Sequence, residues 1–355
     1  MRLAVILVHY HTPELAAEAL AALRADVARV EGGIEWLLVD NGSTAEERAL
    51  LERLPVRRID PGRNLGYAGG VNLGVAESSA ESILLMNPDV LVLPGCVPAL
   101  LACLDGGAAV AGPRFYWDRT HRLLLPPAER RTRRDELLAL LAAHCEPWAA
   151  RARRRWRRHA RRHWEAVRPL RSPWLSGSLL AVRRRAWERA GPFDEGFRLF
   201  YEETDWLLRV WRLGLPIWYV PGAEAIHLYN QSAGQEPRAG QWFEESAQRF
   251  RRLHYGAWFA RLLTAVDSRL GRAGLRPPPA APSMEIELPP GAAWVELSPN
   301  ATGFPAAAER VSRSAGSRWA PPAEIAGALP PAGLRVQVAD AAGREAARWS
   351  LSSGA

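Results

Sequence analysis

Short apolar runs that each end on polar residues constrain this fold more than any other feature of the sequence. LAVILV (3–8), EWLLVD (35–40) and SILLMNPDV (82–90) are apolar enough to be buried on both faces, and helix-like sequence separates them. Strands of this kind with helices between them form a parallel sheet that is covered on both sides. The N-terminal part of the chain therefore predicts an α/β fold, and its first apolar run indicates a buried strand rather than a signal peptide.

Polar side chains follow these strands at the edge where ligands bind in parallel sheets. Asp40 opens the turn DNGST, where a strand-terminal acid either shapes the turn or accepts the imide N–H of a pyrimidine base. Asp89 follows the run SILLM and is either a turn residue or a ligand for Mg²⁺ or Mn²⁺ beside a diphosphate. His227, in HLYNQS, is a second candidate metal ligand, although a lone histidine is more often structural.

A glycine-rich stretch, GRNLGYAGGVNLG (62–74), leads into a helix. It is either a flexible loop or a place where backbone N–H groups approach a phosphate or a ribose closely. Its glycines lack the G-x-G-x-x-G spacing and do not follow the first strand, which disfavours a dinucleotide-binding fold.

The stretch FRLFYEETDWLLRV (197–210) places three carboxylates among aromatic residues. A solvated helix start explains the acids but not the aromatics, whereas an active site explains both. One carboxylate of such a cluster can act as a general base, because partial burial and like-charged neighbours raise its pKa toward neutrality. Asp205 is equally well placed to pair with Arg209 one helical turn further on.

The basic residues are unevenly distributed. All 46 are arginine, and fourteen of them lie between 130 and 171 against four acids, so this segment is more basic than the whole chain with its net charge of +8. On a helix, one broad face of this segment collects Trp148, Ala152, Trp156, Ala160 and Trp164. We favour an anionic membrane surface as its partner over a purely solvated helix. Nucleic-acid binding is disfavoured, because the other motifs do not call for it.

The sequence predicts two domains. Residues 1–275 form the α/β domain, with an Arg-rich helical insertion at about 120–172, and 276–282 (RPPPAAP) form a proline-rich linker. Residues 283–355 alternate with a period of two in MEIELP, AWVELS, LRVQVAD and ARWSLS, which predicts a small antiparallel β-sandwich. Its tryptophans are either platforms for carbohydrate or core residues, and core packing is the more common use.

The order of the motifs resembles glycosyltransferase family 2. DNGST, NLGYAGGVN, LLMNPDV, WLSGSLLAVRR, GPFDEGF, EETDWLLRVWRLG and HLYNQS follow one another over about residues 3–235. Rhamnosyltransferase-like and galactofuranosyltransferase-like bacterial members are the most similar. The resemblance implies the GT-A fold, in which a Rossmann-like, mostly parallel sheet has a nucleotide-sugar half and an acceptor half. Where the metal motif of the family often has two acids, this chain has Asn87 and Asp89.

Carried over by position, the resemblance implies roles for individual residues. Those expected to line the nucleotide site are Thr12, Asp40, Asn64, Gly66 and Asn72. Those expected at the sugar and acceptor site are Trp174, Gly177 and Ser178, and the expected metal ligands are Asp89 and His227. Glu203 falls at the position of the general base, with Glu202 and Asp205 flanking it.

These roles imply a metal-dependent, inverting transfer of a sugar from a UDP- or dTDP-sugar to a hydroxyl of a glycan or lipid-linked acceptor in cell-surface polysaccharide assembly. The expected cofactor is a divalent cation, Mn²⁺ or Mg²⁺. The alternatives are a nucleotidyltransferase on a similar sheet, and a nucleic-acid or lipid-surface binding module with a degenerate transferase domain. Three cysteines without metal-like spacing indicate a cytoplasmic protein, which 148–164 would hold at the inner face of the membrane. The sequence leaves the oligomeric state open.

Overall fold

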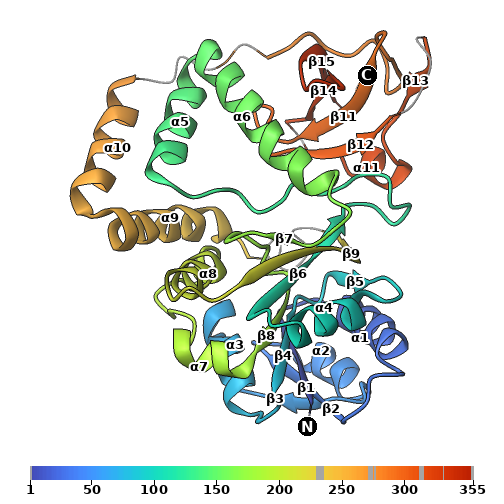
Figure 1. Ribbon diagram of the computed structural model, residues 1–355, viewed down its shortest axis with the longest axis vertical. Coiled ribbons are helices and arrows are strands. Elements are labelled where there is room, and N and C mark those ends of the chain that lie inside the picture. The colour runs from blue at the N-terminus through green and yellow to red at the C-terminus, as the bar shows by residue number, and fades with distance from the viewer. Residues whose placement is uncertain are drawn as a thin grey trace. The chain divides into compact units, whose positions relative to one another are not determined.

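The chain folds into two compact units. The computed structural model describes residues 2–228, 236–270, 275, 277–311, 316–330 and 332–352. The first unit consists of Met1–Phe115 and Ala166–Ala257, and the second of Tyr116–Glu165 and Trp258–Ala355. Each unit is therefore built from two separate stretches of the chain (Figure 1).

The first unit contains a large mixed sheet. Over the described residues its strand order is β3-β2-β1-β4-β8-β6-β9-β5, and β7 pairs with β9. The parallel half consists of β1 (Leu3–His9), β2 (Ile34–Asp40), β3 (Arg57–Ile59) and β4 (Ser82–Met86). The other half, which includes the antiparallel pairs β4 with β8 and β5 with β9, consists of β5 (Val90–Val92), β6 (Val110–Tyr116), β7 (Leu170–Arg171), β8 (Leu179–Arg183) and β9 (Ile217–His227).

Helices cover both faces of this sheet (Figure 1). One face carries α1 (Pro13–Asp26), α2 (Ala45–Leu51) and α4 (Cys96–Asp105), and here α1 and α4 pack on Leu3, Val5 and Leu7 of β1. The opposite face of β1, with Ala4, Ile6 and Val8, packs against α3 (Gly66–Ala76), α7 (Arg184–Ala190) and α8 (Glu202–Arg212). The helix α9 (Ala239–Tyr255) also belongs to this unit. The expected α/β fold with buried strands and flanking helices is confirmed.

Two elements differ from the expected ones. The run SILLMNPDV is not one strand, because β4 ends at Met86, 87–89 form a turn, and β5 is a separate strand paired with β9. The sequence also predicts one helix over 239–265, whereas the structure has two, α9 and α10 (Ala257–Leu270). Gly256 separates them with φ of +90°, a backbone conformation that ends a helix and that glycine adopts without steric strain.

The second unit combines small antiparallel sheets with helices. Its four-stranded sheet has the order β12-β11-β14-β15, and a separate two-stranded sheet pairs β10 with β13. The strands are β10 (Ile286–Glu287), β11 (Ala292–Ser298), β12 (Ala307–Arg310), β13 (Arg318–Trp319), β14 (Leu334–Asp340) and β15 (Glu345–Leu351). The helices are α5 (Arg133–His144), α6 (Glu146–Trp164), α10 and α11 (Ala323–Gly327). The small antiparallel β structure expected at the C-terminal end is confirmed.

The Arg-rich segment belongs to this second unit, which differs from the insertion in the α/β domain that the sequence predicted. Trp156 and Trp164 of α6 form one buried cluster with Trp294 of β11, and the rings of Trp164 and Trp294 lie 5.3 Å apart. The proline-rich stretch also differs from a free linker, because the N–H of Ala281 donates to the carbonyl of Ser350 (2.8 Å). The boundary between the units therefore falls before α10 and not at 276–282.

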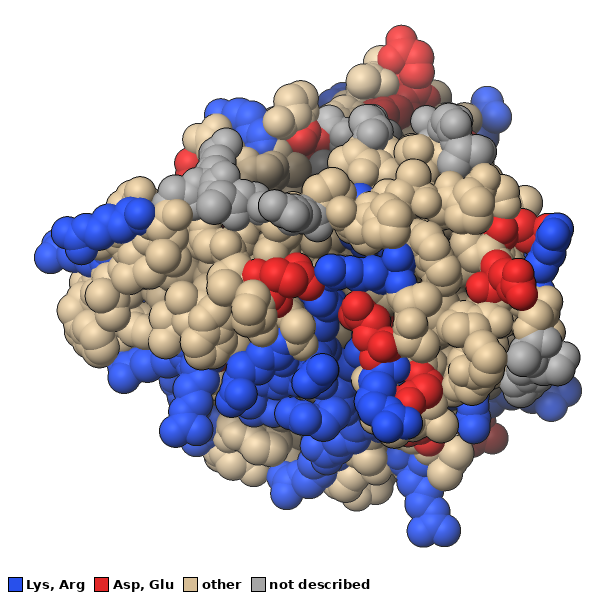
Figure 2. Space-filling model, turned by 90° about the horizontal axis from the view of Figure 1, so that it is seen from above, with Lys and Arg blue, Asp and Glu red and all other residues tan. Residues whose placement is uncertain are grey.

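The aromatic face of α6 is a core face and not the lipid-facing surface expected from the sequence. Trp156 and Trp164 are 7% and 5% exposed, whereas Trp148 at the start of the helix is 41% exposed. The exposed side of the helix consists mainly of arginine. Figure 2 shows arginine side chains gathered on one face of the molecule. In the ranges that the structure describes, no helix has both the length and the apolar character needed to cross a membrane.

Candidate active site

A buried polar network around His9 joins the ends of β1 and β2. Nε2 of His9 accepts a hydrogen bond from the N–H of Thr12 (3.0 Å), and its Nδ1 lies 3.1 Å from Oγ of Ser43. Burial lowers the pKa of His9 below its ordinary 6.5, in spite of the nearby Asp40 charge, so the ring is neutral and Nδ1 carries the proton. Thr12 stands at the N-cap of α1, without a side-chain capping bond. No role for His9 was predicted, although its place at the end of a buried strand was a usable signal.

Asp40 ends β2 and is 1% exposed. Its Oδ1 accepts a hydrogen bond from the N–H of Ser43 (3.0 Å), and its Oδ2 accepts one from Nη1 of Arg58 (2.8 Å). Burial alone would raise the pKa of this carboxyl, but the hydrogen bonds outweigh burial and hold its pKa below the usual value. Asp40 is therefore an ionised acceptor held rigidly at the end of the strand.

The glycine-rich stretch is tied both to β2 and to the segment before α8. Oδ1 of Asn41 accepts from the N–H of Leu65 (2.8 Å), and Oδ1 of Asn64 accepts from the N–H of Gly66 (2.8 Å). Gly66 has φ of +74°, and a Cβ there would lie 2.6 Å from the carbonyl oxygen of Arg198. Only glycine fits such a position, which explains how α3 begins so close to the segment that carries the acids.

Asn72 makes a structural contact. Its Nδ2 donates to the carbonyl of Phe193 (3.0 Å) and to Oε1 of Glu195 (2.9 Å), and its Oδ1 accepts from the N–H of Phe193 (2.9 Å). The amide group thus fastens α3 to the loop before α8. This use differs from the nucleotide contact that the family resemblance implies for Asn72.

Tyr67 of α3 interacts with three segments of the site. Its hydroxyl donates to the carbonyl of Gly177 (3.3 Å). Burial, followed by the charges of Glu202, Glu203 and Asp89, raises the pKa of the phenol well above its usual 10. The acids at the start of α8 and in the turn after β4 therefore act on the same phenol, which bonds to the segment that leads into β8. Tyr67 was not predicted as a site residue, although an aromatic residue inside a glycine-rich stretch was a signal.

The two glutamates at the start of α8 have different surroundings. Glu202 is 5% exposed, and its Oε2 is buried without a hydrogen-bond partner among the described residues. Burial, and then the charge of Glu203, raises the pKa of Glu202 well above 4.5, which favours the protonated form of this carboxyl. Glu203 is half-buried and packs on Gly177, where an added Cβ would lie 2.7 Å from Cγ of Glu203. Thr204 Oγ1 donates to Glu203 Oε1 (3.2 Å).

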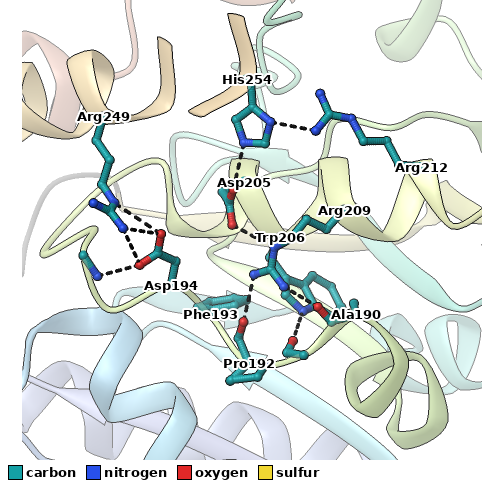
Figure 3. Close-up of polar contacts among 12 residues, drawn as sticks. Ala190, Pro192, Phe193, Asp194, Asp205, Trp206, Arg209, Arg212, Arg249 and His254 are labelled. Atoms are coloured by element: carbon teal, nitrogen blue, oxygen red, sulfur yellow. Dashed lines mark hydrogen bonds and ion pairs between the residues drawn. The ribbon is translucent and has the colours of Figure 1, made fainter. Parts of the chain in front are cut away.

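Asp205 belongs to an ion-pair network that links α8 to α9 (Figure 3). Its Oδ2 lies 2.9 Å from Nε of Arg209, and its Oδ1 lies 2.8 Å from Nε2 of His254. Burial alone would raise the pKa of this carboxyl. The hydrogen bonds from His254 and Arg209 outweigh burial, so the pKa of Asp205 lies below its usual value. The expected pairing with Arg209 is confirmed, and the contacts of Asp205 are structural rather than directed at Glu203.

The backbone immediately before α8 is strained. Phe200 and Tyr201 have φ of 67° and 69°, the left-handed region that costs a side-chain-bearing residue about 1–2 kcal/mol. The Phe243 ring of α9 lies 5.5 Å from both aromatic rings, and Oγ of Ser246 donates to the carbonyl of Leu199 (2.9 Å). Packing against α9 therefore holds the strained turn that presents Glu202 and Glu203.

The expected sugar and acceptor residues lie in the segment that leads into β8. The carbonyl of Ser178 accepts from the N–H of Asn87 (2.9 Å), and Oγ of Ser178 lies 3.0 Å from Oγ of Ser176. Gly177 contacts both Tyr67 and Glu203. Trp174 is 9% exposed and packs in the wall of this segment.

Asp89 and His227 meet at the turn after β4 and the end of β9. Oδ1 of Asp89 lies 3.5 Å from Nε2 of His227. Two ligand atoms about 2.1 Å from one Mg²⁺ or Mn²⁺ ion lie roughly 3 Å apart, so this separation suits a shared cation. Oδ1 of Asn87 is buried without a hydrogen-bond partner in the described part of the chain and adds a carbonyl oxygen nearby. The donor set therefore fits a hard divalent cation, although the described residues include no group of three His, Cys, Asp or Glu that could hold one.

Comparison with known proteins points to one class of enzyme. Residues 4–171 match the model of glycosyl transferase family 2. The chain is 31% identical over 229 residues to an N-acetylglucosaminyl-diphospho-decaprenol L-rhamnosyltransferase of Mycobacterium tuberculosis, over 58% of this chain and 70% of that protein. It is 26% identical over 241 residues to a low-salt glycan biosynthesis hexosyltransferase of Haloferax volcanii, over 66% and 68% of the two chains.

The sheet, the acid cluster at its strand ends and these likenesses define a glycosyltransferase. The chain belongs to glycosyl transferase family 2, as the order of its motifs predicted. The expectation of an enzyme is thereby confirmed, and the similarity to rhamnosyltransferases extends to the rhamnosyltransferase WbbL of Escherichia coli, with 31% identity over 78 residues covering 22% of this chain and 30% of that protein.

Proposed function

We propose that this glycosyltransferase moves a sugar from a UDP- or dTDP-sugar to a hydroxyl of a glycan or lipid-linked acceptor, with inversion at the anomeric carbon. The observation that carries the proposal is that Glu203 packs on Gly177, while the carbonyl of the next residue, Ser178, accepts from the N–H of Asn87 in the turn that carries Asp89. The relative in M. tuberculosis is named for an acceptor built on diphospho-decaprenol, which supports a lipid-linked acceptor in cell-surface polysaccharide assembly.

We assign the nucleoside of the donor to the network at the ends of β1 and β2. The ionised carboxylate of Asp40 accepts the imide N–H of the base, which needs an acceptor at a fixed place. Thr12 lies in the same network through its hydrogen bond to His9. We also assign Asn64 and Gly66 to the nucleoside, because they lie at the N-terminal end of α3, which Asn41 ties to the turn after β2 through the N–H of Leu65.

Glu203 acts as the general base in this proposal. The acceptor hydroxyl passes its proton to Glu203 while its oxygen bonds to the anomeric carbon, and the bond from that carbon to the diphosphate oxygen breaks. The electron pair leaves with the nucleoside diphosphate, so a single displacement inverts the configuration. The raised pKa of Glu202 favours its neutral form, which limits the negative charge beside the base. Gly177 leaves room for the side chain of Glu203, and Tyr67 fixes the carbonyl of Gly177.

Asp89 and His227 would hold the divalent cation, with Asn87 beside them. Bound there, Mn²⁺ or Mg²⁺ would neutralise the charge that develops on the leaving diphosphate. Gly177, Ser178 and Trp174 form the neighbouring wall, to which we assign the transferred sugar and the acceptor.

Substitution of the base and of the metal ligand tests this function. Glu203→Gln and Asp89→Ala are expected to lower turnover by about 100-fold or more while the protein still folds. Exposed Glu188→Gln on α7 is the matched control and should keep full turnover. The measurement is release of nucleoside diphosphate from a panel of UDP- and dTDP-sugars, together with a thermal-shift screen of the same donors with and without Mn²⁺. The proposal fails if none of these donors gives metal-dependent stabilisation.

A further inference from the structure

Two arginines share one tryptophan next to the segment that carries Glu203. The guanidinium carbons of Arg198 and Arg238 lie 5.3 and 5.0 Å from the centroid of the Trp242 ring. Both arginines are exposed, while Trp242 is 8% exposed. A guanidinium held against an aromatic face is oriented, and its N–H groups stay able to donate to a planar or tetrahedral oxyanion. This arrangement suits recognition of phosphate.

Arg198 and Arg238 have fewer close acidic partners than the neighbouring arginines have. Arg209 and Arg249 form close ion pairs with Asp205 and Asp194 (Figure 3). Arg238, by contrast, lies 3.9 Å from Oε1 of Glu236, at the limit of an ion pair. Within the described ranges, no acid pairs with Arg198. The local positive charge is therefore available to an anionic ligand.

Contacts on two sides place this arginine pair beside the proposed catalytic segment. The carbonyl of Arg198 accepts from the N–H of Tyr67 (3.2 Å), whose hydroxyl donates to the carbonyl of Gly177, the residue on which Glu203 packs. Phe243, which follows Trp242, contacts the ring of Tyr201 immediately before Glu202. All of these residues belong to the first unit.

The start of α9 adds to the positive potential at this place. Arg238 is the N-cap residue of this 17-residue helix; no side chain caps the first turn, although the N–H of Arg238 itself donates to Oε1 of Glu236 (3.0 Å). The first N–H groups of a helix without a side-chain cap carry a partial positive charge that favours an anion. Two guanidinium groups and a helix start thus converge around Trp242.

We propose that Arg198 and Arg238 bind a diphosphate, and that this diphosphate belongs to the acceptor. The inference rests on the proposed function, in which the cation at Asp89 and His227 takes the diphosphate of the donor. A second cationic position beside Glu203 is then left for a second anionic group. The acceptor named for the M. tuberculosis relative carries a diphosphate between its sugar and its lipid. The acceptor class is therefore a sugar on a lipid diphosphate, with the sugar hydroxyl toward Glu203 and the diphosphate on the arginine pair.

A binding experiment tests the site without turnover. Inorganic pyrophosphate is titrated calorimetrically into the full chain in the presence of a metal chelator, so that no cation at Asp89 contributes. The double variant Arg198→Gln/Arg238→Gln is expected to bind pyrophosphate at least about tenfold more weakly than wild type. Arg185→Gln/Arg189→Gln, which removes two exposed arginines of α7, is the matched control and should bind as wild type does. Equal affinity in all three proteins would overturn the site.

Kinetic measurements test whether the arginine pair binds the acceptor or the donor. The acceptors are N-acetylglucosaminyl diphosphate on a short prenyl chain and octyl N-acetylglucosaminide, which lacks phosphate. The double variant should raise KM for the diphosphate acceptor about tenfold and leave KM for the donor and for the octyl glycoside unchanged. An increase in donor KM, or an equal effect on both acceptors, would overturn the assignment to the acceptor. If wild type turns over no nucleotide sugar, the proposed function fails, while the pyrophosphate titration still decides whether the arginine pair binds a diphosphate.

Discussion

Glu202 and Glu203 are neighbours in one helical turn, yet they meet different surroundings. Glu202 is almost fully buried, whereas Glu203 is half-buried and rests on Gly177. A pair of acids in one apolar site cannot both ionise cheaply, so the more buried one keeps its proton. The division of roles between the two thus follows from burial and not from chemical type.

The buried acid makes stability depend on pH. The pKa of Glu202 is raised in the folded protein above its value of 4.5 in the unfolded chain, so between these two values the unfolded state has lost a proton that the folded state keeps. The free energy of unfolding therefore falls as pH rises above about 4.5. Glu202→Gln, which cannot ionise, is expected to have a higher Tm than wild type, by a margin that grows as the pH rises above about 4.5. A margin independent of pH in thermal melts would contradict this assignment.

Gly177 is the residue whose missing side chain leaves room for Glu203. In Gly177→Ala the new Cβ would meet Cγ and Cβ of Glu203 at 2.7 and 2.9 Å, so the carboxylate has to move. We expect turnover to fall at least about tenfold with donor KM unchanged, since displacement by about 1 Å is enough to disturb a catalytic group. Gly222→Ala, where nothing lies within 4 Å of the new Cβ, is the control. Equal turnover in the two variants would show that Glu203 tolerates displacement.

At the scale of elements, the position of α8 depends on its links to α9 and to the 190–194 loop. Arg209 donates to the carbonyl of Pro192 (2.8 Å) while it pairs with Asp205, and Arg249 of α9 pairs with Asp194 (Figure 3). These contacts surround the strained turn at Phe200 and Tyr201. The network therefore contributes to the geometry of the glutamates without touching a substrate.

The two aspartates of this network are expected to differ in their contribution to stability. The pair of Asp205 with His254 is buried, with both side chains 5% exposed, so Asp205→Ala leaves polar partners uncompensated and should cost about 3–5 kcal/mol. The pair of Asp194 with Arg249 is 31% and 40% exposed, and Asp194→Ala should cost less than about 1 kcal/mol. Urea unfolding of both variants measures the difference. Similar losses would mean that burial does not set the strength of these pairs.

The sequence predicts local elements better than it predicts what covers them. The buried strands β1, β2 and β4 and the polar residues after them follow from apolar runs and turn residues within a few positions. The contacts of Asn72 and of Trp164 depend on partners more than a hundred residues away, Phe193 and Trp294. A helical pattern shows that Trp156 and Trp164 share a face, but the same pattern fits a lipid surface and a β-sheet. Only the fold distinguishes the two.

At the scale of the whole molecule, α6 presents a row of exposed arginines. The exposed positions Arg151, Arg154, Arg158 and Arg162 repeat at helical spacing, and arginines gather on one face of the molecule (Figure 2). We propose that this stripe holds the protein at an anionic membrane surface by electrostatic attraction alone, since Trp156 and Trp164 are buried.

Cosedimentation with phosphatidylglycerol vesicles tests the stripe. Replacing its four arginines by Gln is expected to abolish most binding, and wild-type binding should disappear at about 0.5 M salt because screening weakens surface electrostatics. The control replaces four exposed arginines of the first unit, Arg53, Arg63, Arg185 and Arg189. Binding that survives both high salt and loss of the stripe would contradict an electrostatic contact.

The second unit is built from two separate stretches of the chain, so a C-terminal truncation alone cannot remove all of it. During synthesis α6 is made well before the strands that cover it. The side chains of Trp156 and Trp164 therefore stay uncovered until β11 and β12 have been made. Deleting 283–355 would expose those aromatic rings to water and favour aggregation. A different deletion removes the whole second unit. Arg114 donates to the carbonyl of Ala166 (2.7 Å), so the two points at which the first unit is interrupted lie close together. A minimal enzyme is best made by joining 115 to 166 through a short loop and ending the chain near 257.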